Sequence, residues 1–192
     1  MIDDIYDPQK LNRYAYCRNN PINYTDPSGH VTWPTESTSI TTSNKGYFNE
    51  QRPTYQHGGV DIAGNVGDDI SNVERGIVIR VGPESRSGLR VTVKLKDGST
   101  VMYAHLSKIE KSIKIGAEIG EGQKVGEMGR TGYEKTNAPT HLHLEIRNEK
   151  RKPLDPGKTL RGMMTFRDKL FTWLGFKTRI PKTEKDPNGR IH

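Results

Sequence analysis

The residues of this sequence best suited to chemistry are histidines in three short motifs. In one motif His141 and His143 are separated by a single residue, and Glu145 follows at the same spacing. Successive side chains of a β-strand point to opposite faces, so a strand here places these three on one face. The intervening residues are apolar and can enter a core: Leu142, Leu144 and Ile146. One strand therefore offers two imidazoles to a single point while its other face anchors it.

The other two motifs supply further groups that bind metal ions. His57 and Asp61 lie four residues apart, and Gly58 and Gly59 between them suit a tight backbone next to a metal. His105 lies inside a strand pattern. Two histidines and an aspartate are a good ligand set for zinc, with a fourth position left to water. Each histidine alone is more often structural, but the joint pattern favours a metal-dependent hydrolase.

Strand patterns and turn signals predict the fold that holds these motifs. Polar and apolar residues alternate over 77–81, 91–95 and 100–106. The glycines between residues 113 and 132 fit neither nucleotide-binding spacing, so they predict short strands joined by turns. We expect a mainly β fold of antiparallel sheets, with an open groove that has the histidine strand at its floor.

A hairpin is expected to fix the position of His105. Asp97-Gly98 separates the second and third strand patterns and is the strongest short hairpin signal. With strict alternation along the return strand, Val101, Tyr103 and His105 share one face.

The C-terminal part has a different character. Apolar residues at helical spacing predict a short helix from Leu160 to Leu174, with Gly175 as its stop. This apolar, partly aromatic stripe has two interpretations: contact with a membrane or cell wall, or packing on its own domain. We favour packing on its own domain. From Lys177 onward, prolines and a glycine predict a disordered end.

Composition limits the class of protein. The 192 residues carry a net charge of +7, and the excess of Lys and Arg over Asp and Glu is located in residues 147–192. A basic extension can bind nucleic acid or an anionic cell wall, or it can serve only to keep the protein soluble. The single cysteine, Cys17, excludes an internal disulfide and a thiolate zinc site. No apolar run approaches a membrane span, and residues 1–30 lack the core of a signal peptide.

The motifs HGGVDIAG, YAHLS and THLHLE, in this order, resemble the lysostaphin-type (LytM-like) zinc metalloendopeptidases, which cut peptidoglycan peptides. The resemblance covers about residues 38–156, although Leu144 stands where that family more often has an aromatic residue. It implies a duplicated hybrid motif for the fold. It also implies an enzyme of the extracellular space, periplasm or cell wall.

The resemblance further implies roles for individual residues. One zinc ion per chain would be held by His57, Asp61 and His143. His105 and His141 would be catalytic: one accepts the proton of the zinc-bound water that attacks the peptide bond, and the other stabilises the tetrahedral intermediate. Glu145 is not a ligand in that family, and we interpret it as supporting the sheet.

Residues 1–35 resemble the end of an Rhs/YD-repeat core, the shell that precedes variable C-terminal toxin domains. Four short pieces broken by Asn-Pro and Asp-Pro turns carry this resemblance. It predicts an Rhs-like leader over 1–35, a zinc peptidase domain over 36–158 and a basic extension over 159–192. It also implies a toxin whose partners are an Rhs shell or an immunity protein.

Two other functions are open to such a chain. A catalytically inactive relative would bind the wall or regulate another hydrolase, but inactive members usually lose ligands, and here every ligand position is filled. A nuclease would need a carboxylate cluster or a nuclease motif, and the sequence has neither, so no nucleic acid partner is expected. The sequence therefore predicts an active peptidoglycan endopeptidase.

Overall fold

The structure is a computed structural model that describes residues 31–42, 45–132, 139–164, 173–174, 180–185 and 189. The Rhs-like segment lies almost entirely outside the described residues, so the predicted domain boundaries stay predictions. Within the described part, no helix has the length and apolar character needed to cross a membrane.

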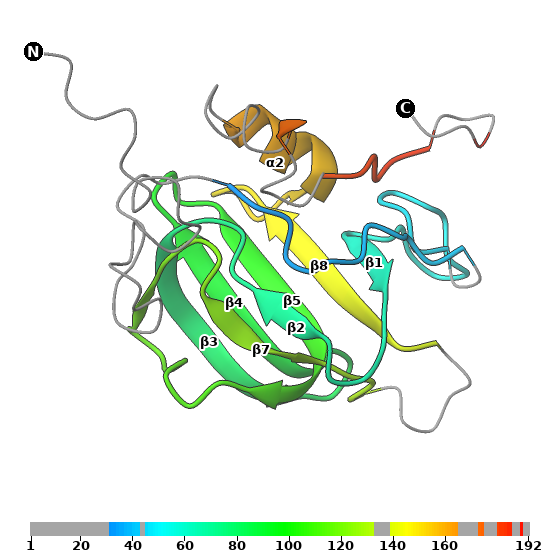
Figure 1. Ribbon diagram of the computed structural model, residues 1–192. Coiled ribbons are helices and arrows are strands. Elements are labelled where there is room, and N and C mark those ends of the chain that lie inside the picture. Colours follow the sequence, from blue (N-terminus) through cyan, green and yellow to red (C-terminus); the bar gives the residue numbers. More distant parts are fainter. Residues whose placement is uncertain are drawn as a thin grey trace, which may run out of the picture.

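The described chain is built mainly of strands joined in one sheet (Figure 1). The strands are β1 (Val60–Ala63), β2 (Asp69–Ser71), β3 (Gly76–Glu84), β4 (Gly88–Leu95), β5 (Thr100–Ile109), β6 (Glu118–Ile119), β7 (Lys124–Met128), β8 (His141–Arg147) and β9 (Pro153–Leu154), and helix α2 (Pro156–Met163) follows them. The strand pairings are antiparallel. This confirms the predicted mainly antiparallel β fold with a short helix.

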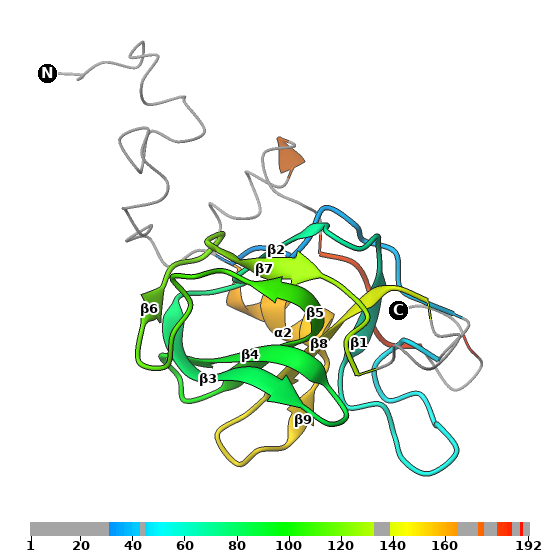
Figure 2. The same cartoon turned by 90° about the horizontal axis from the view of Figure 1, so that it is seen from below.

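The sheet curls, so that β2 and β7 lie opposite β3 and β4 (Figure 2), and buried side chains of these four strands belong to one core cluster. Along the sheet the order is β1, β8, β5, β4, β3 and β6. The histidine strand β8 is therefore held between β1 and β5. The register sets Asp61 beside His143 on one side and Ala104 beside it on the other. Pairing on both sides fixes which face of β8 its histidines occupy.

The alternation predicted for β8 is present. Leu142, Leu144 and Ile146 are fully buried in the core, and the interleaved residues His143 and Glu145 line a groove on the other face. Burying each of these aliphatic side chains stabilises the fold by about 1.5–3 kcal/mol. The apolar face of β8 therefore fixes the position of the groups on its other face.

His105 breaks the alternation predicted for its strand. Tyr103 and Leu106 are both buried in the core, whereas His105 lines the groove. The backbone of His105 has a φ of 63°, and the pairing of β5 with β4 and with β7 shifts register nearby. Such a bulge turns one side chain to the opposite face. The prediction that His105 shares a face with Tyr103 is therefore wrong.

The C-terminal part also differs from expectation. Helix α2 begins at Pro156, four residues before the predicted start, because Asp155 caps it by accepting a hydrogen bond from the Lys158 amide. Residues 165–172 of the predicted helix lie outside the described residues. Leu160, Met163 and Met164 pack on the core, as the favoured interpretation expects, whereas Trp173 is 81% exposed.

Residues 180–185, predicted to be disordered, pack against the domain. Thr183 is fully buried, accepts a hydrogen bond from the Gly157 amide and donates one to Asp155. Its carbonyl oxygen accepts a hydrogen bond of 2.7 Å from the Phe48 amide. The burial and hydrogen bonds of Thr183 order this segment, although its prolines predicted disorder. A local sequence pattern contains no information about such distant partners.

Candidate metal centre

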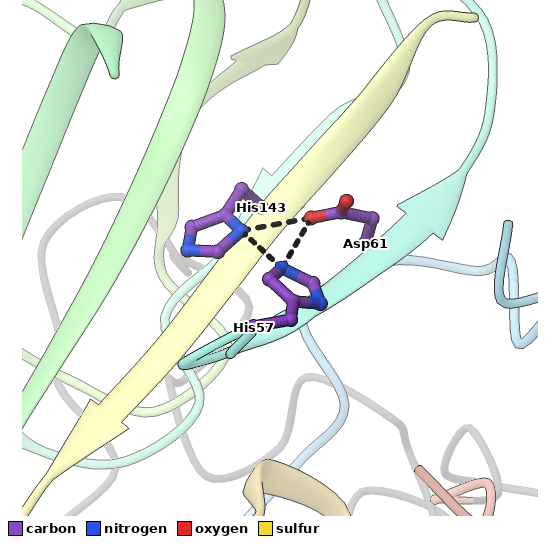
Figure 3. Close-up of side chains that lie close together, drawn as sticks. All are labelled: His57, Asp61 and His143. Carbon is purple, nitrogen blue, oxygen red and sulfur yellow. Dashed lines mark hydrogen bonds and ion pairs between the residues drawn. The ribbon is translucent and has the colours of Figure 1, made fainter. Parts of the chain in front are cut away.

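Three side chains from two neighbouring strands and one loop meet at a point (Figure 3). His143 Nδ1 lies 2.8 Å from Asp61 Oδ1 and 3.1 Å from His57 Nε2. His57 Nε2 in turn lies 3.1 Å from the same carboxylate oxygen. Two imidazole nitrogens and one carboxylate oxygen are ligand types that zinc prefers, and all three face one another in a largely buried site. The site fits a zinc ion.

Glycine at position 59 allows the His57 loop to approach β8. A Cβ atom there would lie 2.5 Å from the Leu144 carbonyl oxygen and 2.9 Å from Cε1 of the His143 ring. Any larger residue would push the loop away from β8 and separate His57 from its partners. Close backbone approach next to the metal ligands is what the Gly-Gly pair predicted.

Two further histidines complete the site. The rings of His105 and His141 are 4.9 Å apart between centroids, and the His105 ring is 6.0 Å from that of His143. Burial lowers the pKa of His105 to about 4, and burial likewise lowers the pKa of His141. Both imidazoles are therefore neutral near pH 7 and can accept a proton.

Backbone carbonyl groups orient three of the four imidazoles. A neutral ring whose Nδ1–H donates to a carbonyl presents its Nε2 as an acceptor. The three Nδ1 atoms face carbonyl oxygens as follows: His57 at 2.9 Å from Tyr47, His105 at 2.9 Å from Thr131 and His141 at 2.8 Å from Pro139.

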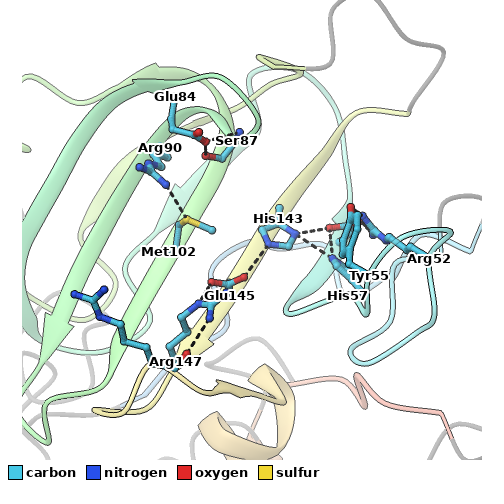
Figure 4. A network of polar contacts seen from close by, with 12 residues as sticks. Arg52, Tyr55, His57, Glu84, Ser87, Arg90, Met102, His143, Glu145 and Arg147 are labelled. Carbon is cyan, nitrogen blue, oxygen red and sulfur yellow. Dashed lines mark hydrogen bonds and ion pairs between the residues drawn. The ribbon is translucent and has the colours of Figure 1, made fainter.

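Glu145 belongs to this site, which the sequence interpretation missed. It is only 12% exposed; one carboxylate oxygen lies 3.8 Å from His143 Nε2, and the other accepts a hydrogen bond from Arg147 (Figure 4). Burial lowers the pKa of His143, but Asp61 and Glu145 outweigh it and raise that pKa to about 9. A carboxylate behind a histidine ligand fixes the ring and increases its basicity. Glu145 therefore does more than support the sheet.

Arg52 also belongs to this site, and no pattern in the sequence indicated it. Its Nη2 lies 2.5 Å from Asp61 Oδ2, and the same nitrogen donates to the Lys45 carbonyl oxygen at 3.2 Å. Asp61 is buried, which raises its pKa, but hydrogen bonds from His143 and His57 keep that pKa well below its usual value. The carboxylate is thus ionised, with Oδ1 facing the histidines and Oδ2 held by Arg52.

Replacing Arg52 with glutamine is expected to weaken zinc binding about 10- to 100-fold, because Asp61 loses the partner that orients it. Competition for zinc with a chromophoric chelator measures this directly. Arg86→Gln is the matched control, since both guanidinium groups lie over the Tyr55 ring, at 5.8 and 5.6 Å, but only Arg52 contacts Asp61. Equal zinc affinity of the two variants would show that Asp61 is oriented without Arg52.

The centre opens into a groove of about 950 Å³ that runs across β3, β4, β5 and β8. His57, Asp61, His105 and His143 line it together with side chains from the outer face of the sheet. The predicted open groove, with the histidine strand at its floor, is therefore present. A peptide laid across the sheet would bring its backbone past the four groups.

Comparison with protein families matches residues 55–156 to Peptidase family M23. Among curated proteins the chain is 30% identical over 130 residues to the Lipoprotein NlpD/LppB homolog of Pseudomonas aeruginosa, covering 67% of this chain and 39% of that protein. It is 31% identical over 90 residues to the Peptidoglycan DD-endopeptidase ShyA of Vibrio cholerae, covering 47% and 20%. It is 32% identical over 116 residues to the Murein hydrolase activator NlpD of Escherichia coli, covering 60% and 27%. The chain thus spans well under half the length of these relatives.

Solved structures share the fold. The catalytic domain of lysostaphin from Staphylococcus simulans superposes with a TM-score of 0.54 at 25% identity, covering 64% of this chain and 99% of that domain. A zinc containing peptidase from Vibrio cholerae gives the same TM-score and identity, covering 64% of this chain and 38% of that one. The family match over residues 55–156 includes His57, Asp61 and His143.

Proposed function

Because the chain belongs to peptidase family M23 and carries a zinc site of the type found in that family, we propose that it hydrolyses peptide bonds of peptidoglycan stem or cross-bridge peptides. One observation carries this proposal. The ligand set His57, Asp61 and His143 lies in an open groove with two further neutral histidines beside it. That is the set of groups a metal-assisted hydrolysis requires.

The chain's own residues divide the work. Zinc, when bound, supplies a Lewis acid and lowers the pKa of water. Of His105 and His141, one accepts a proton at Nε2 while its Nδ1–H stays on a backbone carbonyl. The other takes up a proton from solvent at Nε2, against its lowered pKa, as negative charge develops on the neighbouring oxygen, and donates a hydrogen bond to that oxygen. Burial of both rings excludes water that would weaken these interactions.

A regulatory role is the second candidate, because one relative is named as a murein hydrolase activator. Digestion of purified cell wall of known cross-link chemistry, followed by mass spectrometry of the fragments, separates the two. A peptidase releases peptide fragments cut at one type of bond, and chelation of the metal stops the release. Wall binding without any fragment would favour the regulatory role.

The Rhs-like sequence of residues 1–35 supports a more specific proposal, that the chain acts as a delivered toxin against a competitor's wall. Expressed with a periplasmic signal, the chain is expected to lyse or round Escherichia coli cells. Cytoplasmic expression is expected to be harmless, because the cytoplasm contains no wall. Viable counts and microscopy of the two cultures measure this. Equal toxicity in both compartments would contradict a target in the wall.

A further inference from the structure

The groove that contains the metal centre is strongly basic. Its lining includes seven cationic side chains: Arg52, Arg80, Arg86, Arg90, Lys94, Arg147 and Arg151. Four carboxylates also line the groove; three of them contact neighbouring groups, and the fourth, Glu149, is exposed. Asp61 contacts His143 in the metal centre, and Glu145 pairs with Arg147. Glu84 accepts hydrogen bonds from the hydroxyl and amide of Ser87, which lower its pKa to about 2.

Three of the cations form a strip on the outer face of β3 and β4, which we call the cationic strip: Arg80, Arg90 and Lys94. Within the described part of the chain, none of them forms an ion pair with a carboxylate. Arg90 makes only a weak contact of 3.9 Å from Nη1 to the Met102 sulfur (Figure 4). The strip therefore presents positive charge to whatever enters the groove.

Several cations elsewhere on the sheet form ion pairs with carboxylates. Lys108 pairs with Glu127 at 2.8 Å, and Lys124 pairs with Asp69 at 2.6 Å. Arg75 pairs with Glu118 at 3.4 Å. Lys111 and Lys114 are exposed without an ion pair in the described part of the chain, but they lie outside the groove, whereas the cationic strip gathers three such charges inside it. Like charges gathered in a groove repel one another, so the arrangement favours an anionic ligand.

We propose, building on the endopeptidase function, that the cationic strip makes the groove selective for peptides that carry free carboxylates. In wall chemistry this means the acidic stem peptides and not a glycine cross-bridge, which has no side-chain charge. Arginine binds a carboxylate through two parallel hydrogen bonds, which fix the position of the peptide as well as attract it. Arg80, Arg90 and Lys94 are then specificity-determining residues at a distance from the reacting bond.

Two cross-linked stem peptides that differ only by amidation of their free carboxylates provide the test. For the wild-type protein we expect kcat/KM to be at least about tenfold higher for the carboxylate form, and the ratio to fall as salt is added. The triple variant Arg80→Gln, Arg90→Gln, Lys94→Gln is expected to lose this preference through KM, so that it cleaves the two peptides with similar kcat/KM. Equal cleavage of both peptides by the wild type would overturn the proposal.

A matched control removes the same charge elsewhere. Lys111, Lys114 and Lys158 are exposed and lie outside the groove, so changing all three to glutamine alters net charge equally. This variant is expected to keep the wild-type preference; loss of the preference here would mean that net charge, not the strip, selects the peptide. If neither peptide is cleaved, the endopeptidase function fails, and calorimetric binding decides the selectivity. Tighter binding of the carboxylate form would support it, and equal binding would overturn it.

Discussion

Replacing His143 with alanine is expected to yield a protein that purifies with little zinc and has no measurable hydrolysis. His143 Nδ1 faces both other ligand atoms, so its removal leaves the metal with two protein contacts. Ligands contribute cooperatively to affinity, and the loss of one of three removes most of it. Elemental analysis of the purified protein beside a wall-peptide assay measures both effects.

His30→Ala is the control for this experiment, because His30 lies outside the three motifs and no role is assigned to it. It is expected to keep one zinc per chain and full activity. Near-stoichiometric zinc in His143→Ala would contradict the proposed ligand set, even if activity were lost.

Replacing His141 or His105 is expected to give the opposite pattern, with zinc retained and turnover reduced on the order of 10²-fold or more. Both rings lie beside the ligand atoms but are held by backbone carbonyls. His141 lies two residues from His143 on the same face of β8. The variants His141→Ala and His143→Ala therefore compare two positions of one strand. Zinc content, kcat and a circular dichroism spectrum of each variant measure the difference.

The left-handed backbone at position 105 calls for a second substitution there. Alanine is strained at a φ of 63°, whereas asparagine tolerates this conformation. His105→Asn is therefore expected to fold like the wild type and to lose turnover as His105→Ala does. If His141→Ala lost its metal as readily as His143→Ala, the division into ligands and catalytic groups would be wrong.

The part of the site that the sequence predicted depends on local rules. The two-residue period of a strand placed His143 and Glu145 on one face of β8 and its leucines on the other, because that period holds in any paired strand. The ligand roles came from the resemblance of the motifs to a family. Neither source needed knowledge of which distant segments pack together.

What the sequence did not predict depends on such packing. The bulge that turns His105 into the groove arises where β5 changes its pairing with β4 and β7, which no local pattern encodes. Arg52 contacts Asp61 only because the loop folds back onto β1. Residues 180–185 looked disordered because their buried partners, such as Asp155, lie far away in the sequence.

The contact between residues 180–185 and the loop before β1 also has a consequence for the order in which the newly made chain folds. A ribosome releases the chain from its N-terminus, so His57, Asp61 and His143 all emerge before Thr183. Until then the loop that carries His57 lacks the hydrogen bond between Phe48 and Thr183 and the ion pair of 3.0 Å between Glu50 and Lys185. A newly made chain therefore gains these two contacts only after all three ligand residues have been made. A chain cut before residue 180 keeps every proposed ligand and catalytic group, yet lacks the segment that closes the loop around them.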